Sequence, residues 1–173
     1  YGGDSDTFIW AWVLFIAFIV GSTMIIGRSA SRTEKKRQAE KSLEISKILE
    51  KEQLTWEVFE KKLQETFYAF QKAWSNFDVH VMQSFLTDDY FKRIVLQMNV
   101  LQNQKRRNLM PYVKLHRITF VEKKGEELIF QISAHARDIL QDQETNRQLF
   151  EDDSAFTEYW HFVRDNHHWR LDG

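Results

Sequence analysis

The longest apolar segment of the chain runs from Phe8 to Ile26 and contains no charged residue. A helix of this length rises about 28 Å, which is close to the roughly 30 Å thickness of the hydrocarbon layer of a bilayer. A helix in the core of a soluble protein would normally carry a polar stripe, and this segment has none. The pattern therefore predicts a transmembrane helix over residues 8–26, preceded by an external tail at residues 1–7.

Basic residues follow this segment closely, whereas the charged residues before it, Asp4 and Asp6, are both acidic. The basic residues that follow are Arg28, Arg32, Lys35, Lys36 and Arg37. The positive-inside rule places them on the inner side of the membrane. We therefore expect a bacterial cytoplasmic membrane protein with its N-terminus outside, or alternatively a mitochondrial inner-membrane protein facing the matrix.

Residues 27–53 are rich in Lys, Arg, Glu and Gln, and most of them are good helix formers. This composition predicts a basic juxtamembrane helical stalk. Its basic cluster could attract anionic lipid headgroups at about 1 kcal/mol per residue. The alternative is a solvated helix face that carries only the topology signal.

From Thr55 the apolar residues recur at spacings of three and four, which predicts an amphipathic helix ending near Ser75 and Asn76. Thr55 can cap this helix, or the stalk can continue through it. Asp78 is expected to cap a short second helix, and Thr87 a third. The third helix is expected to run into residues 104–108 and to stop before Pro111.

The apolar period then changes to two, which predicts strands. The four expected strands are Tyr112–Glu122, Leu128–Arg137, Phe156–Arg164 and His168–Leu171. The expected connections are a turn at Lys123–Glu126, a long hairpin loop at Gln141–Ser154 and a turn at Asp165–His167. Three helices followed by an antiparallel meander indicate an α+β fold, with the helices packed on one face of a four-stranded sheet.

Composition narrows the class of protein further. The chain has 173 residues, a formal net charge of −1 and no cysteine. A chain of this charge shows no strong nucleic-acid footprint, and disulfides and thiolate chemistry are excluded. After the predicted span, enough sequence remains for one domain with its own core. We expect no cofactor and no metal ion.

Two groups of residues are candidates for binding. The apolar-pocket candidates, which could instead form an ordinary core, are Trp74, Phe130, Trp160, Phe162 and Trp169. A second basic cluster at the expected helix end consists of Lys105, Arg106 and Arg107. This cluster could complement the helix dipole or contact lipid phosphates, and the sequence does not decide between them.

Catalysis is a competing hypothesis. Asp138 together with His116 or His135 could act as an acid–base pair if the side chains converged in one cavity. Single ionisable residues near strand ends more commonly satisfy turns, so we predict a binding protein rather than an enzyme. The discriminating observation is whether these side chains share one accessible pocket.

Several short motifs occur in order along the chain from Phe67 onward. They are Phe67–Trp74 (FYAFQKAW), Leu86–Asp88 (LTD), Arg106–Asn108 (RRN), Ala134–Asp138 (AHARD) and Phe156–Trp160 (FTEYW). The order resembles the C-terminal domain family of the mitochondrial import-motor tether, the Tim-forty-four-like domain. The resemblance covers residues 54–173 and implies a cone-shaped fold similar to nuclear transport factor two.

The resemblance also implies a role beside a membrane, since family members tether a chaperone or a ribosome there and bind acidic lipid. This chain differs from the mitochondrial tether because it carries its own predicted span, which favours an anchored bacterial form. We therefore expect a single-pass scaffold that engages a protein partner or anionic lipid, in protein translocation or membrane-protein biogenesis. The alternative is an enzyme or small-ligand binder that uses an apolar cavity.

Overall fold

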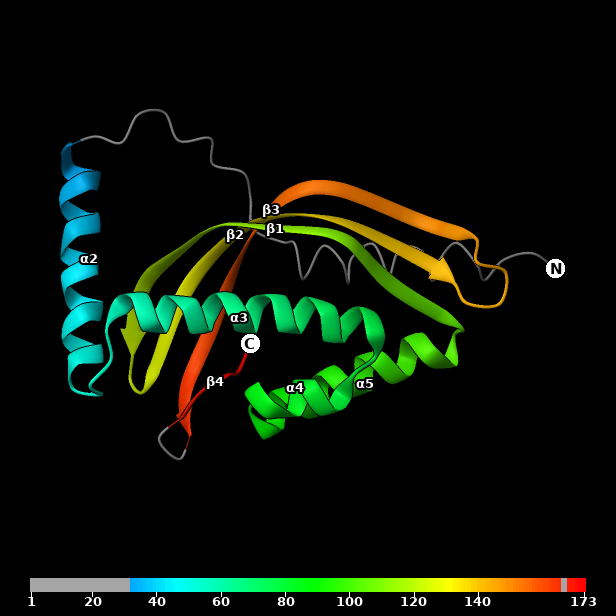
Figure 1. The fold of residues 1–173 in the computed structure, drawn as a ribbon, viewed down its shortest axis with the longest axis horizontal. Coiled ribbons are helices and arrows are strands. Elements are labelled where there is room, and N and C mark those ends of the chain that lie inside the picture. The colour runs from blue at the N-terminus through cyan, green and yellow to red at the C-terminus, as the bar shows by residue number, and fades with distance from the viewer. Residues whose placement is uncertain (1–31, 166–167) are drawn as a thin grey trace.

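The computed structural model describes residues 32–165 and 168–173, and within them helices precede strands, as shown in Figure 1. The elements are α2 (Arg32–Glu50), α3 (Trp56–Asn76), α4 (Val79–Phe85), α5 (Asp88–Asn103), β1 (Arg106–Lys124), β2 (Glu127–Asp142), β3 (Gln148–Asp165) and β4 (His168–Leu171). The strands form one antiparallel sheet in the order β1-β2-β3-β4. The predicted α+β class and the predicted meander are confirmed.

The predicted transmembrane helix, Phe8–Ile26, lies outside the described residues. Among residues 32–165 and 168–173, no helix has both the length and the apolar character needed to cross a bilayer.

Side-chain caps start three of the helices at the residues that the sequence indicates. Thr55 Oγ1 accepts a hydrogen bond from the Val58 amide at 3.4 Å, so α3 begins after Thr55 and is separate from α2. Asp78 and Thr87 cap α4 and α5 in the same way. Each cap satisfies an amide that has no partner inside its helix.

Two predicted boundaries are wrong. Helix α5 ends at Asn103 and residues 106–108 already belong to β1, where they pair with residues 140–142 of β2. The predicted long loop 141–154 is a short turn, because β2 continues to Asp142 and β3 begins at Gln148. The Asp142 carboxylate accepts hydrogen bonds from the amides of Glu144 and Thr145, which tightens this turn. Backbone pairing between strands outweighed local polarity at both places.

The sheet curves over α3 and α5, as Figure 1 shows. Strand β1 has register shifts between Leu109 and Tyr112, between Leu115 and Arg117, and between Phe120 and Glu122. Irregularities of this kind bend a strand and increase its twist. Pro111 lies within the first of them on an edge strand, where its missing amide proton costs no ladder bond.

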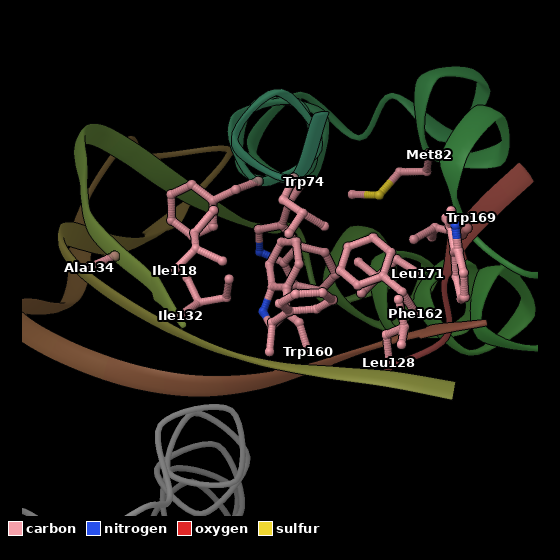
Figure 2. Packing of buried hydrophobic residues seen from close by; sticks show 14 of the residues in the cluster. Trp74, Met82, Ile118, Leu128, Ile132, Ala134, Trp160, Phe162, Trp169 and Leu171 are labelled. Atoms are coloured by element: carbon pink, nitrogen blue, oxygen red, sulfur yellow. The ribbon is translucent and has the colours of Figure 1, made fainter. Parts of the chain in front are cut away.

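The core fills the space between α3 and the concave face of the sheet (Figure 2). Phe59, Leu63 and Phe67 form the buried stripe of α3, as the sequence predicts. Phe130 on β2 is fully buried, and its ring lies 5.8 Å from that of Phe59 and 5.9 Å from that of Phe162. Burial of each such ring is among the largest single contributions to the stability of a domain.

Helix α2 stands at the end of the sheet where α3 begins (Figure 1). Ile45 and Leu49 in its second half are buried in the main core, whereas its first half is exposed. Lys41 Nζ lies 5.7 Å from the centre of the Phe120 ring, and Glu52 beyond the helix forms an ion pair with Arg164 of β3. The second half of α2 therefore packs against the domain, and only its first half is exposed along its length.

Candidate functional site

A cavity of about 440 Å³ lies between the concave face of the sheet and helices α3 and α5. Cavities of this size commonly hold small ligands. Its lining is contributed by α3, α5, all three long strands and the last described residue. The residues are Phe70, Gln71, Trp74, Tyr90, Arg93, Ile94, Gln97, Met110, Ala136, Asp138, Asp152, Ser154, Phe156, Thr157, Glu158, Tyr159, Trp160 and Gly173.

Aromatic rings form one wall of the cavity. The Phe70 ring is parallel to that of Tyr90, with centroids 6.4 Å apart, and parallel to that of Trp74 at 6.5 Å. It meets the Trp160 ring edge to face at 5.7 Å. Such pairs hold one another in place, because each ring restricts the rotamers of its neighbours. The wall is thus rigid and apolar.

Three carboxylates line the same cavity: Asp138 on β2, and Asp152 and Glu158 on β3. Asp138 and Asp152 are direct partners in the β2–β3 register, so both side chains stand on the concave face. Ser154 Oγ donates a hydrogen bond to Asp152 Oδ2 at 3.0 Å. Acidic groups therefore gather on the sheet side of the cavity.

Burial is the main cause that raises the pKa of Asp138, to about 6. The negative charge of Asp152 raises it further, while a hydrogen bond from the side chain of Asn108 lowers it. Removal from water disfavours the charged form of a carboxyl, and a like charge nearby has the same effect. Asp138 consequently changes its charge near neutral pH.

The pKa values of Glu158 and Tyr90 are also raised. Burial raises the pKa of Glu158 to about 7, although Trp160 Nε1 donates a hydrogen bond to its Oε2 at 2.9 Å and thereby lowers it. Burial, assisted by the charge of Glu158, raises the pKa of Tyr90 to about 12. Groups with displaced pKa values in one cavity are a recognised mark of functional sites.

Arg93 lines the cavity from α5 and is held at two points. Its guanidinium Nη2 donates a hydrogen bond to the backbone oxygen of Asp172 at 2.7 Å. Its guanidinium carbon lies 5.0 Å from the centre of the Tyr90 ring, in a cation–π contact. The hydrogen bond to Asp172 ties the end of the described chain to α5, and the ring contact fixes the guanidinium on the helix.

The five predicted pocket residues divide into two groups. Trp74 and Trp160 line the cavity. Phe130, Phe162 and Trp169 belong to the packed core and do not line it. Figure 2 shows the two tryptophans with the neighbouring core residues.

The histidines proposed as catalytic partners of Asp138 do not share its cavity. His116 is exposed at an irregularity of β1. His135 is on the opposite face of β2 from Asp138, and its Nε2 lies 2.7 Å from Asp153 Oδ1. The structure therefore does not bring together the acid–base pair that the sequence suggests.

The predicted lipid-binding residues occupy two places. Arg28 lies outside the described residues, and Arg32 begins α2. Lys35, Lys36 and Arg37 are exposed on the first half of α2.

The second cluster is less free. Lys105 is exposed in the turn before β1, and Arg106 and Arg107 are the first residues of that strand. Arg107 Nε donates a hydrogen bond to Gln141 Oε1 at 2.8 Å, which holds its guanidinium against β2. Of the two clusters, the one on α2 is the more available to a membrane surface.

Sequence reasoning missed Tyr90, Asp152 and Glu158 as site residues. Glu158 could have been found, because it lies between Phe156 and Trp160 on the inward positions of an alternating strand. Asp152 was missed because residues 141–154 were predicted to form a loop, whereas Asp152 belongs to β3. For Tyr90, the sequence pattern predicts only a position on the buried face of α5.

No family model matches the chain, and no curated protein matches it. Among solved structures, the intermembrane space region of the chloroplast protein ARC6 has a similar fold. The TM-score is 0.51, with 10% sequence identity over 65% of this chain and 92% of that structure. The similarity concerns the arrangement of helices and sheet alone.

Proposed function

We propose that the protein is a single-pass membrane-anchored binding protein, whose domain holds a partner or ligand at the inner membrane surface. The observation that carries the proposal is the aromatic and acidic cavity of about 440 Å³ between the helices and the concave sheet. A space of this size inside a well-packed domain is typical of a binding site. The predicted span at residues 8–26 supplies the anchor.

The family resemblance supports the same function. The motif order is similar to that of Tim-forty-four-like domains, and helices on one side of a curved sheet around a cavity agree with the cone-shaped fold of that family. We infer a bacterial cytoplasmic membrane location with the domain inside. Protein translocation or membrane-protein biogenesis is the process in which such a scaffold would act.

A protein partner at the cavity is testable by cross-linking in cells. A photo-reactive amino acid replaces Gln97, which lines the cavity from α5 and is partly exposed. We expect a discrete adduct that disappears when Ala136→Trp fills the cavity from β2. The matched control replaces Leu43 on α2, which is 58% exposed and remote from the cavity lining. An adduct that survives Ala136→Trp would contradict binding at the cavity.

Anionic lipid is a second ligand for the same membrane role. Lys35, Lys36 and Arg37 are exposed on the half of α2 nearest the predicted span. Each basic residue at a membrane surface contributes about 1 kcal/mol. Their joint replacement by Glu in a chain spanning residues 32–173 should weaken binding to anionic vesicles at least about tenfold in flotation.

The control for this experiment is replacement of Lys123 and Lys124 by Glu. Both lysines are exposed at the β1–β2 hairpin. An equal loss with the control variant would mean that net charge, not the α2 cluster, attracts the domain. Failure of the unaltered chain to float at low salt would remove the lipid half of the proposal.

An enzyme is the second candidate function, favoured by one observation. Asp138 and Glu158 line one cavity, and burial raises their pKa values to about 6 and about 7, which suits acid–base chemistry at neutral pH. The test compares metabolite extracts incubated with the unaltered chain, with Asp138→Asn and with Glu158→Gln. A compound consumed only by the unaltered chain would support catalysis, and unchanged extracts would argue against it.

A further inference from the structure

Two aspartates face each other on the wall of the cavity. Asp138 on β2 and Asp152 on β3 are direct partners in the antiparallel register. Side chains in such a pair stand about 4.5–5.5 Å apart at Cβ, and like charges there destabilise the sheet. Among residues 32–165 and 168–173, no Lys, Arg or His forms an ion pair with either aspartate. The pair is thus a local cost to the fold.

Two buried acceptors at or next to this pair lack donors among the described residues. Asp138 Oδ1 is buried and has no hydrogen-bond partner among the described residues. Asn108 is only 8% exposed, and its Oδ1 also has no such partner. Buried acceptors in folded proteins are nearly always hydrogen-bonded, so each exception asks for an explanation. These unpaired acceptors add to the cost of negative charge at this wall, and a bound cation would offset that charge.

The aromatic wall has the chemistry to accept a positive charge. The faces of Trp, Tyr and Phe rings are electron-rich and attract cations. Trp74, Trp160, Tyr90 and Phe70 all line the cavity. Within the described residues, Arg93 is the one basic side chain in the lining, and the Asp172 carbonyl already engages its guanidinium.

We propose that the cavity binds an organic cation, a ligand with one ammonium or guanidinium group on an apolar body. The cationic group donates hydrogen bonds to Asp138 and Asp152, and the body lies against the rings of Trp74 and Trp160. This inference rests on the proposed function, in which the cavity is the binding site, and it specifies that the ligand carries a positive charge. In the described part of the chain, no group of three or more His, Asp or Glu residues is arranged to hold a metal ion.

Binding should depend on pH because an ionised carboxylate attracts the cation much more strongly than a neutral carboxyl does. Besides Asp138, the titratable or charged groups of the lining are Asp152 and Glu158 on β3 and Tyr90 and Arg93 on α5. Burial raises the pKa of Asp138 to about 6 and of Glu158 to about 7. Affinity for the cation should therefore rise from pH 5 to pH 8, with release of protons on binding.

The test uses the full chain in zwitterionic lipid nanodiscs and isothermal titration calorimetry, with empty nanodiscs as the blank. Three probes share a phenyl group and differ in charge: phenethylamine, 2-phenylethanol and 3-phenylpropionate. At pH 8 we expect phenethylamine to bind at least about tenfold more tightly than the neutral alcohol, and the anion to bind most weakly. Asp138→Asn and Asp152→Asn should each abolish the preference for the amine while the alcohol still binds.

The control variant is Asp153→Asn, the neighbour of Asp152 whose carboxylate faces the outer side of the sheet and contacts His135. It should keep the full preference for the amine. Circular dichroism verifies that all three variants are folded. Equal binding of amine and alcohol would contradict the proposed preference for a cation but would leave the cavity as a binding site. If none of the three probes binds, the proposed cationic ligand is contradicted, and the result also counts against the cavity as a site for small ligands.

Discussion

Asp138 combines burial, a like-charged partner and one carboxylate oxygen, Oδ1, without a donor, and these features outweigh the hydrogen bond from Asn108 that favours its charged form. Folding raises the pKa of its carboxyl from 3.8 to about 6. A carboxyl whose pKa is higher in the folded state stabilises the fold at low pH, and this contribution is lost as pH rises through the folded-state value. Glu158 acts in the same sense, because burial raises its pKa from 4.5 to about 7.

The first prediction concerns the pH dependence of stability. The free energy of unfolding should fall between about pH 4 and pH 7 as Asp138 and Glu158 ionise. Asp138→Asn removes part of this dependence and should raise stability at pH 8 by about 1–2 kcal/mol, with little effect at pH 4. Urea unfolding at both pH values measures the change. Equal effects at the two pH values would show that ionisation of Asp138 is not the cause.

A second prediction concerns Phe130, whose ring touches those of Phe59, Phe120 and Phe162. Phe130→Ala should lower the free energy of unfolding by about 3–5 kcal/mol, because it leaves a cavity in the centre of the core. Phe150→Ala is the control, since that ring is 40% exposed at the start of β3. Chemical denaturation of the two variants should separate them clearly.

At the scale of elements, α2 is the structure that sequence reasoning described least well. Its first half is exposed, as a stalk should be, but Ile45 and Leu49 are 2% and 0% exposed. They pack against the core formed by α3 and the sheet. A rigid connection of this kind limits how the domain can turn relative to a membrane anchor.

The third prediction tests this docking. Leu49→Ala should cost about 2–5 kcal/mol of stability, because a fully buried side chain is removed. Leu43→Ala on the same helix should change stability by no more than about 0.5 kcal/mol, since Leu43 is 58% exposed. Thermal unfolding of both variants provides the comparison. Similar midpoints would mean that α2 is a free stalk after all.

The fourth prediction concerns Thr87, the cap of α5. Its Oγ1 accepts a hydrogen bond from the Tyr90 amide, and its hydroxyl donates one to Asp172 Oδ1 at 2.5 Å. Thr87→Ala should cost about 1–2 kcal/mol, whereas Thr87→Ser, which keeps the hydroxyl, should cost much less. Because α5 carries Tyr90 and Arg93, loss of the cap should also weaken ligand binding at the cavity.

For the whole molecule, the described residues form one buried core. All residues of this core lie between Ile45 and Leu171. The fifth prediction is that a chain beginning at Arg32 folds with an unchanged thermal midpoint but leaves the membrane fraction of cells. Retention in the membrane fraction after carbonate washing would contradict the assignment of residues 8–26 as the anchor.

The fold class was predictable because its signals are local and repeated. The stripe of α3 and the caps at Thr55, Asp78 and Thr87 depend on residues three or four positions apart. The alternation in β2 and the hairpin turn before it, where Gly125 has a φ of 62°, are equally local. Elements with such signals were placed correctly to within a few residues.

The cavity was only partly predictable. Trp74 and Trp160 were identified as pocket residues because large aromatics on inward positions line either a core or a cavity. Phe130, Phe162 and Trp169 share the same pattern and belong to the core. The pattern shows which way a side chain points, but the depth of packing above it depends on where α3 and α5 cross the sheet.

The sequence by itself determined the order of helices and strands, the starts of three helices and the inward faces, because each follows from residues a few positions apart. Only the tertiary structure decided that β2 continues to Asp142 and β3 begins at Gln148, that α2 docks on the core, and that Asp138 meets Asp152. These features depend on register between distant segments. A shift of one residue in the β2–β3 pairing would move Asp138 or Asp152 to the opposite face and remove the acidic pair from the cavity.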